Sequence, residues 1–205
     1  MKHQRNSVTK FLKHIIIMSD SKFLKSYFKS LKELISNESY FDDLILVKKI
    51  LIQTHKNKKK TMIFGNGGSA AISSHFSVDL TKNAGIRCTN YNESDLLTCF
   101  ANDFGYEKWV EKAVEFYGDE GDSLILISAG GNSPNMTNAA KQARKKKINK
   151  IITFTGNDKN NNLRKLGDIN FWVDSKAYNH IENVHQILLL SLVDLVIGKT
   201  EYPPN

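Results

Sequence analysis

The apolar residues near the start of the chain recur at helical spacing before any strand pattern begins. Between residues 23 and 35 they fall three and four positions apart, which places them on one face of an amphipathic helix. A second stretch with the same period runs from about residue 42 to residue 55. The sequence therefore predicts a pair of N-terminal helices whose apolar sides can pack on the domain or on a partner subunit. The apolar positions of the first helix are Phe23, Leu24, Tyr27, Phe28, Leu31, Leu34 and Ile35.

After residue 60 the pattern changes to short apolar runs that alternate with helical stretches. The predicted strands cover residues 61–64, 86–89, 123–127, 150–154 and 169–173. The predicted helices cover residues 70–82, 94–101, 106–117, 134–147 and 177–197. Because strands separated by helices form parallel sheets covered on both faces, we expect an α/β fold, a three-layer αβα sandwich with a central parallel sheet.

The first residues of the chain differ from the rest. Residues 1–18 carry several basic side chains and end at Met18, a second candidate start, so we expect a disordered extension followed by a single domain over residues 19–205. The two cysteines, Cys88 and Cys99, form neither a disulfide framework nor a zinc ribbon, which favours a reducing cytoplasm. We expect both to be buried packing residues.

The formal net charge of +8 is unevenly distributed. Residues 1–60 hold 14 Lys and Arg against 5 Asp and Glu, and the remainder of the chain is close to neutral. These bases fall on helical stretches and in the lysine-rich loop at 56–60 rather than on one face, so we do not expect a nucleic-acid partner. We also expect no membrane partner, because no apolar run approaches the roughly 20 residues of a membrane helix.

Two glycine-containing loops follow predicted strands and lead into predicted helices. They are residues 65–69, Gly-Asn-Gly-Gly-Ser, and residues 128–133, Ser-Ala-Gly-Gly-Asn-Ser. Ligands of open parallel sheets bind at the carboxyl ends of strands, and a helix N-terminus there offers unpaired N–H groups to an anion. With their serine hydroxyls the loops suit a phosphate monoester. Neither a dinucleotide fingerprint nor a Walker A loop is present, so no nucleotide cofactor is expected.

Histidine and carboxylate side chains recur at helical spacing on two of the predicted helices. His75 and Asp79 are four residues apart and therefore share a face, as do Glu182 and His185. Such a set can supply a carboxylate base with a neighbouring histidine, or ligands for a divalent ion. The alternative for His75 and Asp79 is an ordinary ion pair on the protein surface. The spacing of residues within each helix does not show that the two helices lie close together.

Five stretches of the sequence resemble one family of sugar-phosphate proteins. Residues 64–71, with His75 shortly after them, are similar to the phosphoheptose isomerase branch of the sugar isomerase (SIS) family. So are Asn-Asp-Phe-Gly-Tyr at 102–106, Gly-Asn-Ser-Pro-Asn at 131–135, Thr155-Gly156, and Ile-Glu-Asn-Val-His at 181–185. The resemblance spans about residues 20–198. It implies a flavodoxin-like fold, a cytoplasmic homotetramer with active sites at subunit interfaces, and conversion of sedoheptulose 7-phosphate to D-glycero-D-manno-heptose 7-phosphate for surface polysaccharides such as lipopolysaccharide.

The resemblance also implies roles for particular residues. Asp79 stands where the family has its catalytic base, with His75 beside it, and His75, Asp79 and Glu182 are the implied ligands of a Zn²⁺ ion. The chemistry implied is proton transfer through an enediol, which needs a base beside the carbons and an acid at the oxygens. The implied substrate contacts come from Asn66, Gly67, Gly68, Ser69, Asn92, Glu93, Ser128, Ala129, Gly130, Ser133 and Glu182.

The sequence departs from the family pattern in the catalytic set. Asp79 replaces a glutamate, Glu182 replaces a glutamine, and Leu190 stands where the family has a second histidine that acts as acid or base and binds zinc. Three readings follow: an isomerase with a rearranged site, an isomerase of a different phosphosugar, or a non-catalytic phosphosugar-binding regulator, for example of replication initiation.

Overall fold

The computed structural model describes residues 19–203, which fall into two compact units that meet between Ser36 and Asn37. The predicted extension over residues 1–18 lies outside the described residues. The described part of the first unit is the helix α2 (Asp20–Ile35), which follows the N-cap residue Ser19, whose side chain accepts a hydrogen bond from the backbone N–H of Lys22. None of the residues of α2 is buried, and Phe23 and Phe28 are more than half exposed.

The second unit is built on five parallel strands in the order β2-β1-β3-β4-β5. The strands are β1 (Thr61–Phe64), β2 (Cys88–Thr89), β3 (Ser123–Ser128), β4 (Lys150–Gly156) and β5 (Ile169–Val173). Every residue of β1 and β3 is buried, as expected of central strands covered on both faces. The prediction of a central parallel sheet is therefore confirmed.

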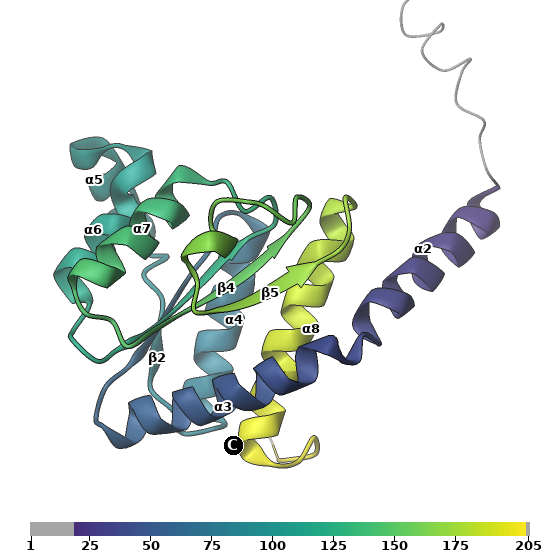
Figure 1. Cartoon of the computed structure of the whole chain (residues 1–205), viewed down its shortest axis with the longest axis horizontal. Coiled ribbons are helices and arrows are strands. Elements are labelled where there is room, and N and C mark those ends of the chain that lie inside the picture. Colours follow the sequence, from purple (N-terminus) through teal and green to yellow (C-terminus); the bar gives the residue numbers. More distant parts are fainter. Residues whose placement is uncertain (1–18, 204–205) are drawn as a thin grey trace, which may run out of the picture. The chain divides into compact units, whose positions relative to one another are not determined.

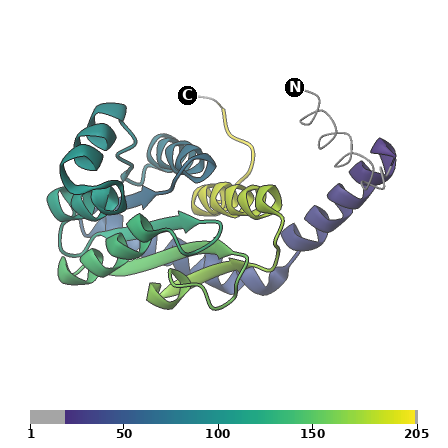
Figure 2. The same ribbon diagram turned by 90° about the horizontal axis from the view of Figure 1, so that it is seen from above.

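Helices cover both faces of this sheet (Figures 1 and 2). One layer holds α3 (Phe41–Lys56), α4 (Gly68–Lys82) and α8 (Tyr178–Ile197), in which α8 packs against both α3 and α4. The other layer holds α5 (Ser94–Phe104), α6 (Trp109–Tyr117) and α7 (Pro134–Lys145), with α6 packed against α5 and α7. Short 3₁₀ turns complete the unit at Glu38–Tyr40, Tyr106–Lys108 and Arg164–Leu166.

The predicted elements are all present, with a few differences at their ends. The edge strand β2 keeps only two of its four predicted residues, because it pairs on one side only, at Thr61↔Cys88 and Met62↔Thr89. The stretch predicted as one helix over 106–117 is a 3₁₀ turn followed by α6. Cys88 is buried as expected, whereas Cys99 is exposed on α5, so the burial predicted for Cys99 is wrong.

One helix is long and apolar. By length and composition α8 could cross a membrane, although Glu182, Ser191 and Asp194 interrupt its apolar run. Eight of its residues are buried, and it packs on α3, α4 and β4. This is the placement of a core helix of the α/β unit.

Candidate functional site

The two predicted loops lie side by side at the carboxyl edge of the sheet. The loop over residues 65–69 leaves β1 and the loop over residues 128–133 leaves β3, and these strands are hydrogen-bonded neighbours in register, with Phe64 opposite Leu126. Each loop leads directly into a helix, α4 or α7. Two helix N-termini therefore converge at one point, which favours an anionic ligand there.

The first loop turns sharply at Gly67, which has φ +54° and ψ −120°. Residues with a side chain rarely adopt this backbone conformation, so glycine is required there. Gly67 and Gly68 are exposed while Ser69 is buried, and the N–H of Ser69 is bonded to the carbonyl oxygen of Asn66 at 3.0 Å. The exposed part of the loop is thus backbone, as a close approach of a phosphate group would need.

Asn66 joins the two loops. Its side-chain Nδ2 donates to Asn135 Oδ1 at 3.1 Å, and Asn135 Nδ2 donates back to Asn66 Oδ1 at 2.8 Å. The hydroxyl of Tyr106 donates to the same Asn66 oxygen at 3.1 Å. Neither Asn135 nor Tyr106 was predicted as a site residue, and no spacing signal marks contacts between segments 40 and 69 positions apart. The predicted contact of Asn66 with substrate stays a prediction.

The second loop carries a pair of serine hydroxyls. Ser128 Oγ and Ser133 Oγ are 3.1 Å apart, and Ser128 Oγ also accepts the backbone N–H of Gly131 at 3.1 Å. Ser133 is the N-cap residue of α7, as predicted from sequence, but its side chain makes no capping hydrogen bond. Its hydroxyl is directed to Ser128 instead, and Gly130 has open space where a Cβ would be. This loop therefore offers two hydroxyls beside uncovered backbone.

Glu182 reaches the first loop from the N-terminal turn of α8. A Cβ added at Gly68 would lie 2.6 Å from Glu182 Oε2 and 2.9 Å from Oε1, so the carboxylate rests against the backbone of Gly68. Glu182 Oε1 is buried and has no hydrogen-bond partner among the described residues. Partial burial, the charge of Glu182 and a hydrogen bond to it together raise the pKa of Tyr178. The structure thus places Glu182 at the glycine loop, with one acceptor oxygen left for a donor.

His75 and Asp79 form the predicted pair on α4. His75 Nε2 lies 3.2 Å from Asp79 Oδ2, with 49% and 25% of the two side chains exposed. Asp79 is eleven residues beyond Gly68, which at the rise of an α-helix is about 16 Å along α4. The pair therefore lies well away from the glycine loops of its own chain.

The described residues hold no group of three His, Cys, Asp or Glu side chains close enough for a metal ion. The zinc ligands implied by resemblance, His75, Asp79 and Glu182, are consequently not brought together within one chain. Leu190, half-buried on α8, adds no ligand. The described residues of a single chain therefore do not fit the zinc site.

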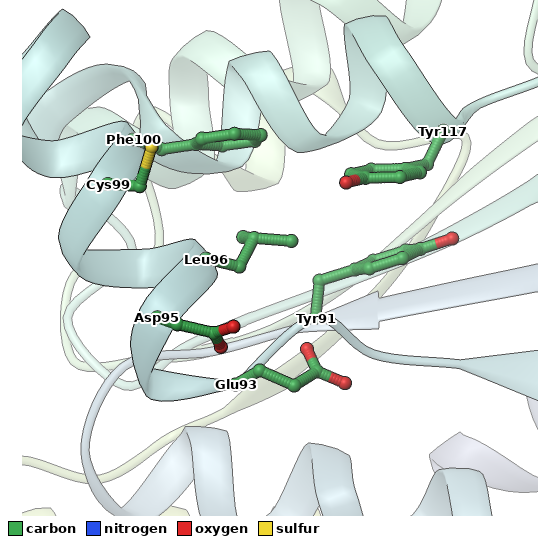
Figure 3. A pocket seen from close by; sticks show the side chains of 7 residues that line it. All are labelled: Tyr91, Glu93, Asp95, Leu96, Cys99, Phe100 and Tyr117. Atoms are coloured by element: carbon green, nitrogen blue, oxygen red, sulfur yellow. The ribbon is translucent and has the colours of Figure 1, made fainter.

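Asn92 and Glu93 lie between β2 and α5 and differ in what they contact. Asn92 Nδ2 donates to the carbonyl oxygen of Ala70 and to Ser74 Oγ, both at 2.9 Å, so this amide ties the loop to α4. Glu93 is exposed and lines a cavity of about 470 Å³, shown in Figure 3 with the rings of Tyr91 and Tyr117 on one side. The position of Glu93 leaves its carboxylate available to accept hydrogen bonds from a ligand. The cavity is lined by Tyr91, Glu93, Asp95, Leu96, Cys99, Phe100 and Tyr117.

His185 is a core residue. It is fully buried, its Nε2 lies 3.1 Å from the carbonyl oxygen of Thr155, and its ring packs edge-on against Phe154. Burial lowers the pKa of His185 to about 4, although the hydrogen bond to Thr155 opposes this shift. His185 shares a helix with Glu182 but is neutral and enclosed, so it does not serve as a proton carrier for a ligand.

Comparison with known proteins agrees with this fold and these loops. A family model described as the SIS domain matches residues 22–156. A phosphoheptose isomerase of Aliarcobacter butzleri is 37% identical over 156 residues, covering 72% of this chain and 80% of that protein. One from Buchnera aphidicola is 31% identical over 173 residues, covering 79% and 89%. The chain therefore belongs to the SIS domain family.

Solved structures show the same fold. A phosphoheptose isomerase from Francisella tularensis superimposes with a TM-score of 0.81 at 24% identity, covering 89% of this chain and all of that one. The Vibrio vulnificus NanR protein complexed with ManNAc-6P superimposes with a TM-score of 0.63 at 14% identity. Within the family, the sequence relatives described above are phosphoheptose isomerases.

Proposed function

We propose that this protein is an aldose–ketose isomerase that converts sedoheptulose 7-phosphate to D-glycero-D-manno-heptose 7-phosphate. The observation that carries the proposal is the match to phosphoheptose isomerases over most of the chain. The two serine- and glycine-bearing loops joined at one edge of the sheet agree with it. The product is a precursor of surface polysaccharide such as lipopolysaccharide. We place the reaction in the cytoplasm.

The phosphate group binds where the two loops meet. Backbone N–H groups at the starts of α4 and α7 and the hydroxyls of Ser128 and Ser133 surround it. The contacts proposed from Gly67, Gly68, Ser69, Ala129 and Gly130 are mainly backbone contacts, which suits the exposed Gly67 and Gly68 and the open space beside Gly130. Glu93 accepts hydrogen bonds from sugar hydroxyls, and Asn92 holds the loop that carries it. Glu182 accepts a further donor through its unpaired oxygen.

The proton transfer falls to Asp79. Its carboxylate takes a proton from C1, the carbon next to the C2 carbonyl, which gives an enediolate, and returns that proton to C2, while the proton of the O1 hydroxyl passes to O2, so that the C2 carbonyl becomes a hydroxyl and C1 becomes the aldehyde. His75, 3.2 Å away, holds this carboxylate in place. Since Asp79 lies about 16 Å along α4 from the glycine loop, we propose that a site is completed between subunits of a homotetramer, in which α2 and its exposed apolar side chains take part. A Zn²⁺ ion would then need ligands from more than one chain.

A second candidate function rests on Leu190. An apolar side chain stands where the family has an acid–base histidine, which favours either a different phosphosugar or a non-catalytic phosphosugar-binding regulator. Two measurements separate these functions. The first is aldose formation from sedoheptulose 7-phosphate, with and without added zinc. The second is thermal stabilisation by a panel of phosphosugars, where a ligand at 100 times its Kd adds about 2.7 kcal/mol.

Turnover of sedoheptulose 7-phosphate supports the isomerase. Turnover of another phosphosugar alone assigns a different substrate. Stabilisation by a phosphosugar without turnover of any member of the panel assigns the regulator.

A further inference from the structure

Four basic residues line a cavity at the amino edge of the sheet, opposite the glycine loops. The cavity measures about 360 Å³ and is lined by His55, Lys58, Lys59 and Arg87, with no acidic residue among them. These residues come from the last turn of α3, the loop before β1 and the position just before β2. The strand β1 separates the cavity from the loop at 65–69, so it is distinct from the proposed phosphosugar site.

Hydrogen bonds fix the backbone and part of the side chains around this cavity. The guanidinium Nη2 of Arg87 donates to the carbonyl oxygen of Lys58, and the backbone N–H of Arg87 donates to His55 Nδ1 at 3.4 Å. Lys58 has φ +61°, a conformation that turns the chain back toward Arg87. Because His55 Nδ1 accepts a bond, the ring nitrogen left to donate is Nε2. The fold therefore fixes the Arg87 guanidinium and the His55 ring, and both lysines line the same cavity.

Within residues 19–203, the charges at this corner have no ion-pair partner, although Lys59 is near enough to Asp119 to contribute to the lowered pKa of that carboxyl. None of the ion pairs among the described residues involves His55, Lys58, Lys59 or Arg87. The next residue, Lys60, is paired with two carboxylates, Asp119 at 2.8 Å and Asp122 at 2.6 Å. A cleft lined by one sign of charge concentrates oppositely charged ions.

The position of the end of helix α3 explains only part of this cluster of basic residues. Basic side chains are favoured in the last turn of a helix, where they can contact its last carbonyl groups, and this explains His55 and the neighbouring Lys56. Lys58 and Lys59 lie beyond the helix, and Arg87 follows 32 residues after His55. Arginine forks and lysine ammonium groups are the side chains that proteins use to hold phosphate oxygens.

We propose that this basic cavity, formed by His55, Lys58, Lys59 and Arg87, binds a small anion with two or more phosphate groups. A single phosphate group faces one or two of these cations, whereas a diphosphate can span the lysines and the arginine together. The cavity volume lies within the usual range of small-molecule sites.

Isothermal titration of the full chain with inorganic pyrophosphate tests the proposal. The test variant is Lys58→Asn with Lys59→Gln, since asparagine tolerates the left-handed backbone of residue 58. Its matched control is Lys141→Gln with Lys145→Gln, which removes the same charge from exposed positions of α7. We expect one saturable site per chain, weakened about tenfold or more in the test variant and within about twofold of the parent in the control. If the double variant has a lower melting temperature than the parent, the pyrophosphate affinity of the single variant Lys59→Gln is compared with that of the parent instead.

Four results would overturn the proposal. They are no saturable binding at low salt, equal weakening in both variants, equally tight binding of inorganic phosphate, or loss of pyrophosphate binding when sedoheptulose 7-phosphate is added. Tighter binding of a single-stranded oligonucleotide than of pyrophosphate would assign the surface to nucleic acid instead. Because sedoheptulose 7-phosphate turnover is measured separately, failure here leaves the proposed isomerase activity standing.

Discussion

The carboxylate of Glu182 rests against Gly68, at the N-terminus of α4. A methyl group at residue 68 would lie 2.6 Å from Glu182 Oε2, closer than unstrained Cβ contacts. These two residues are more than a hundred positions apart in the sequence, yet in the structure they form one side of the glycine loop. A phosphosugar that binds this loop therefore meets a negative charge at one side and two helix N-termini at the other.

Replacing Gly68 with alanine should displace the Glu182 carboxylate without unfolding the chain. Alanine is a better helix former than glycine, by about 1 kcal/mol, and the clashing atoms are the end of a flexible side chain. We expect little change in melting temperature and an increase of about tenfold in KM, the cost of one misplaced charged hydrogen bond. A double-mutant cycle with Glu182→Gln measures the coupling. Strictly additive effects would show that the two residues act independently.

Gly131 should be far less tolerant of alanine than its neighbour Gly130. At Gly131 φ is +66° and an added Cβ would overlap Asn161 Cγ, while a Cβ added at Gly130 would have no atom within 4 Å. We expect Gly131→Ala to lower the free energy of unfolding by about 2 to 4 kcal/mol and Gly130→Ala by less than about 1 kcal/mol. Chemical denaturation of both variants checks this, and equal losses would contradict the packing seen at Asn161.

The hydroxyl of Ser133 should contribute to phosphate binding rather than to helix stability, because it makes no capping bond to α7. We expect Ser133→Ala to raise KM about tenfold, as the loss of a hydrogen bond to a charged group would. The expected change in unfolding free energy is less than the roughly 1 kcal/mol of a lost N-cap. Ser191→Ala, whose hydroxyl bonds only within α8, is the matched control. A large stability loss with unchanged KM would make Ser133 a cap after all.

His185 should make the protein less stable as the pH falls from about 6.5 toward 4. Burial lowers the pKa of His185 in the folded state to about 4 from its ordinary value of 6.5, so the unfolded chain binds a proton in this window and the folded chain does not. The free energy of unfolding therefore keeps the full contribution of neutral His185 above pH 6.5 and loses up to about 3 kcal/mol by about pH 4. We expect His185→Gln to flatten this part of the stability curve. The control is His55→Gln, at an exposed histidine. An equally flattened stability curve in this control would contradict the assignment of the pH dependence to His185.

The sequence was sufficient to predict the sheet and the two loops. These features depend on local signals, namely the alternation of buried strands with helices and the positions of glycine. It was not sufficient for the contacts between the loops. Asn66 with Asn135, and Gly68 with Glu182, join segments that approach only after the sheet has ordered its strands. Cys99 was predicted as buried from residue type alone, whereas its turn of α5 faces a cavity.

If Asp79 is the catalytic base, its loss must lower the initial rate of aldose formation from sedoheptulose 7-phosphate. The parent protein is compared with Asp79→Asn and with Asp42→Asn, an exposed carboxylate in the first turn of α3. We expect turnover by the parent and by Asp42→Asn, and a loss of at least about a hundredfold in Asp79→Asn, as general-base removal produces. Equal rates in the parent and Asp79→Asn, or no turnover by a folded parent that binds the sugar phosphate, would contradict the account.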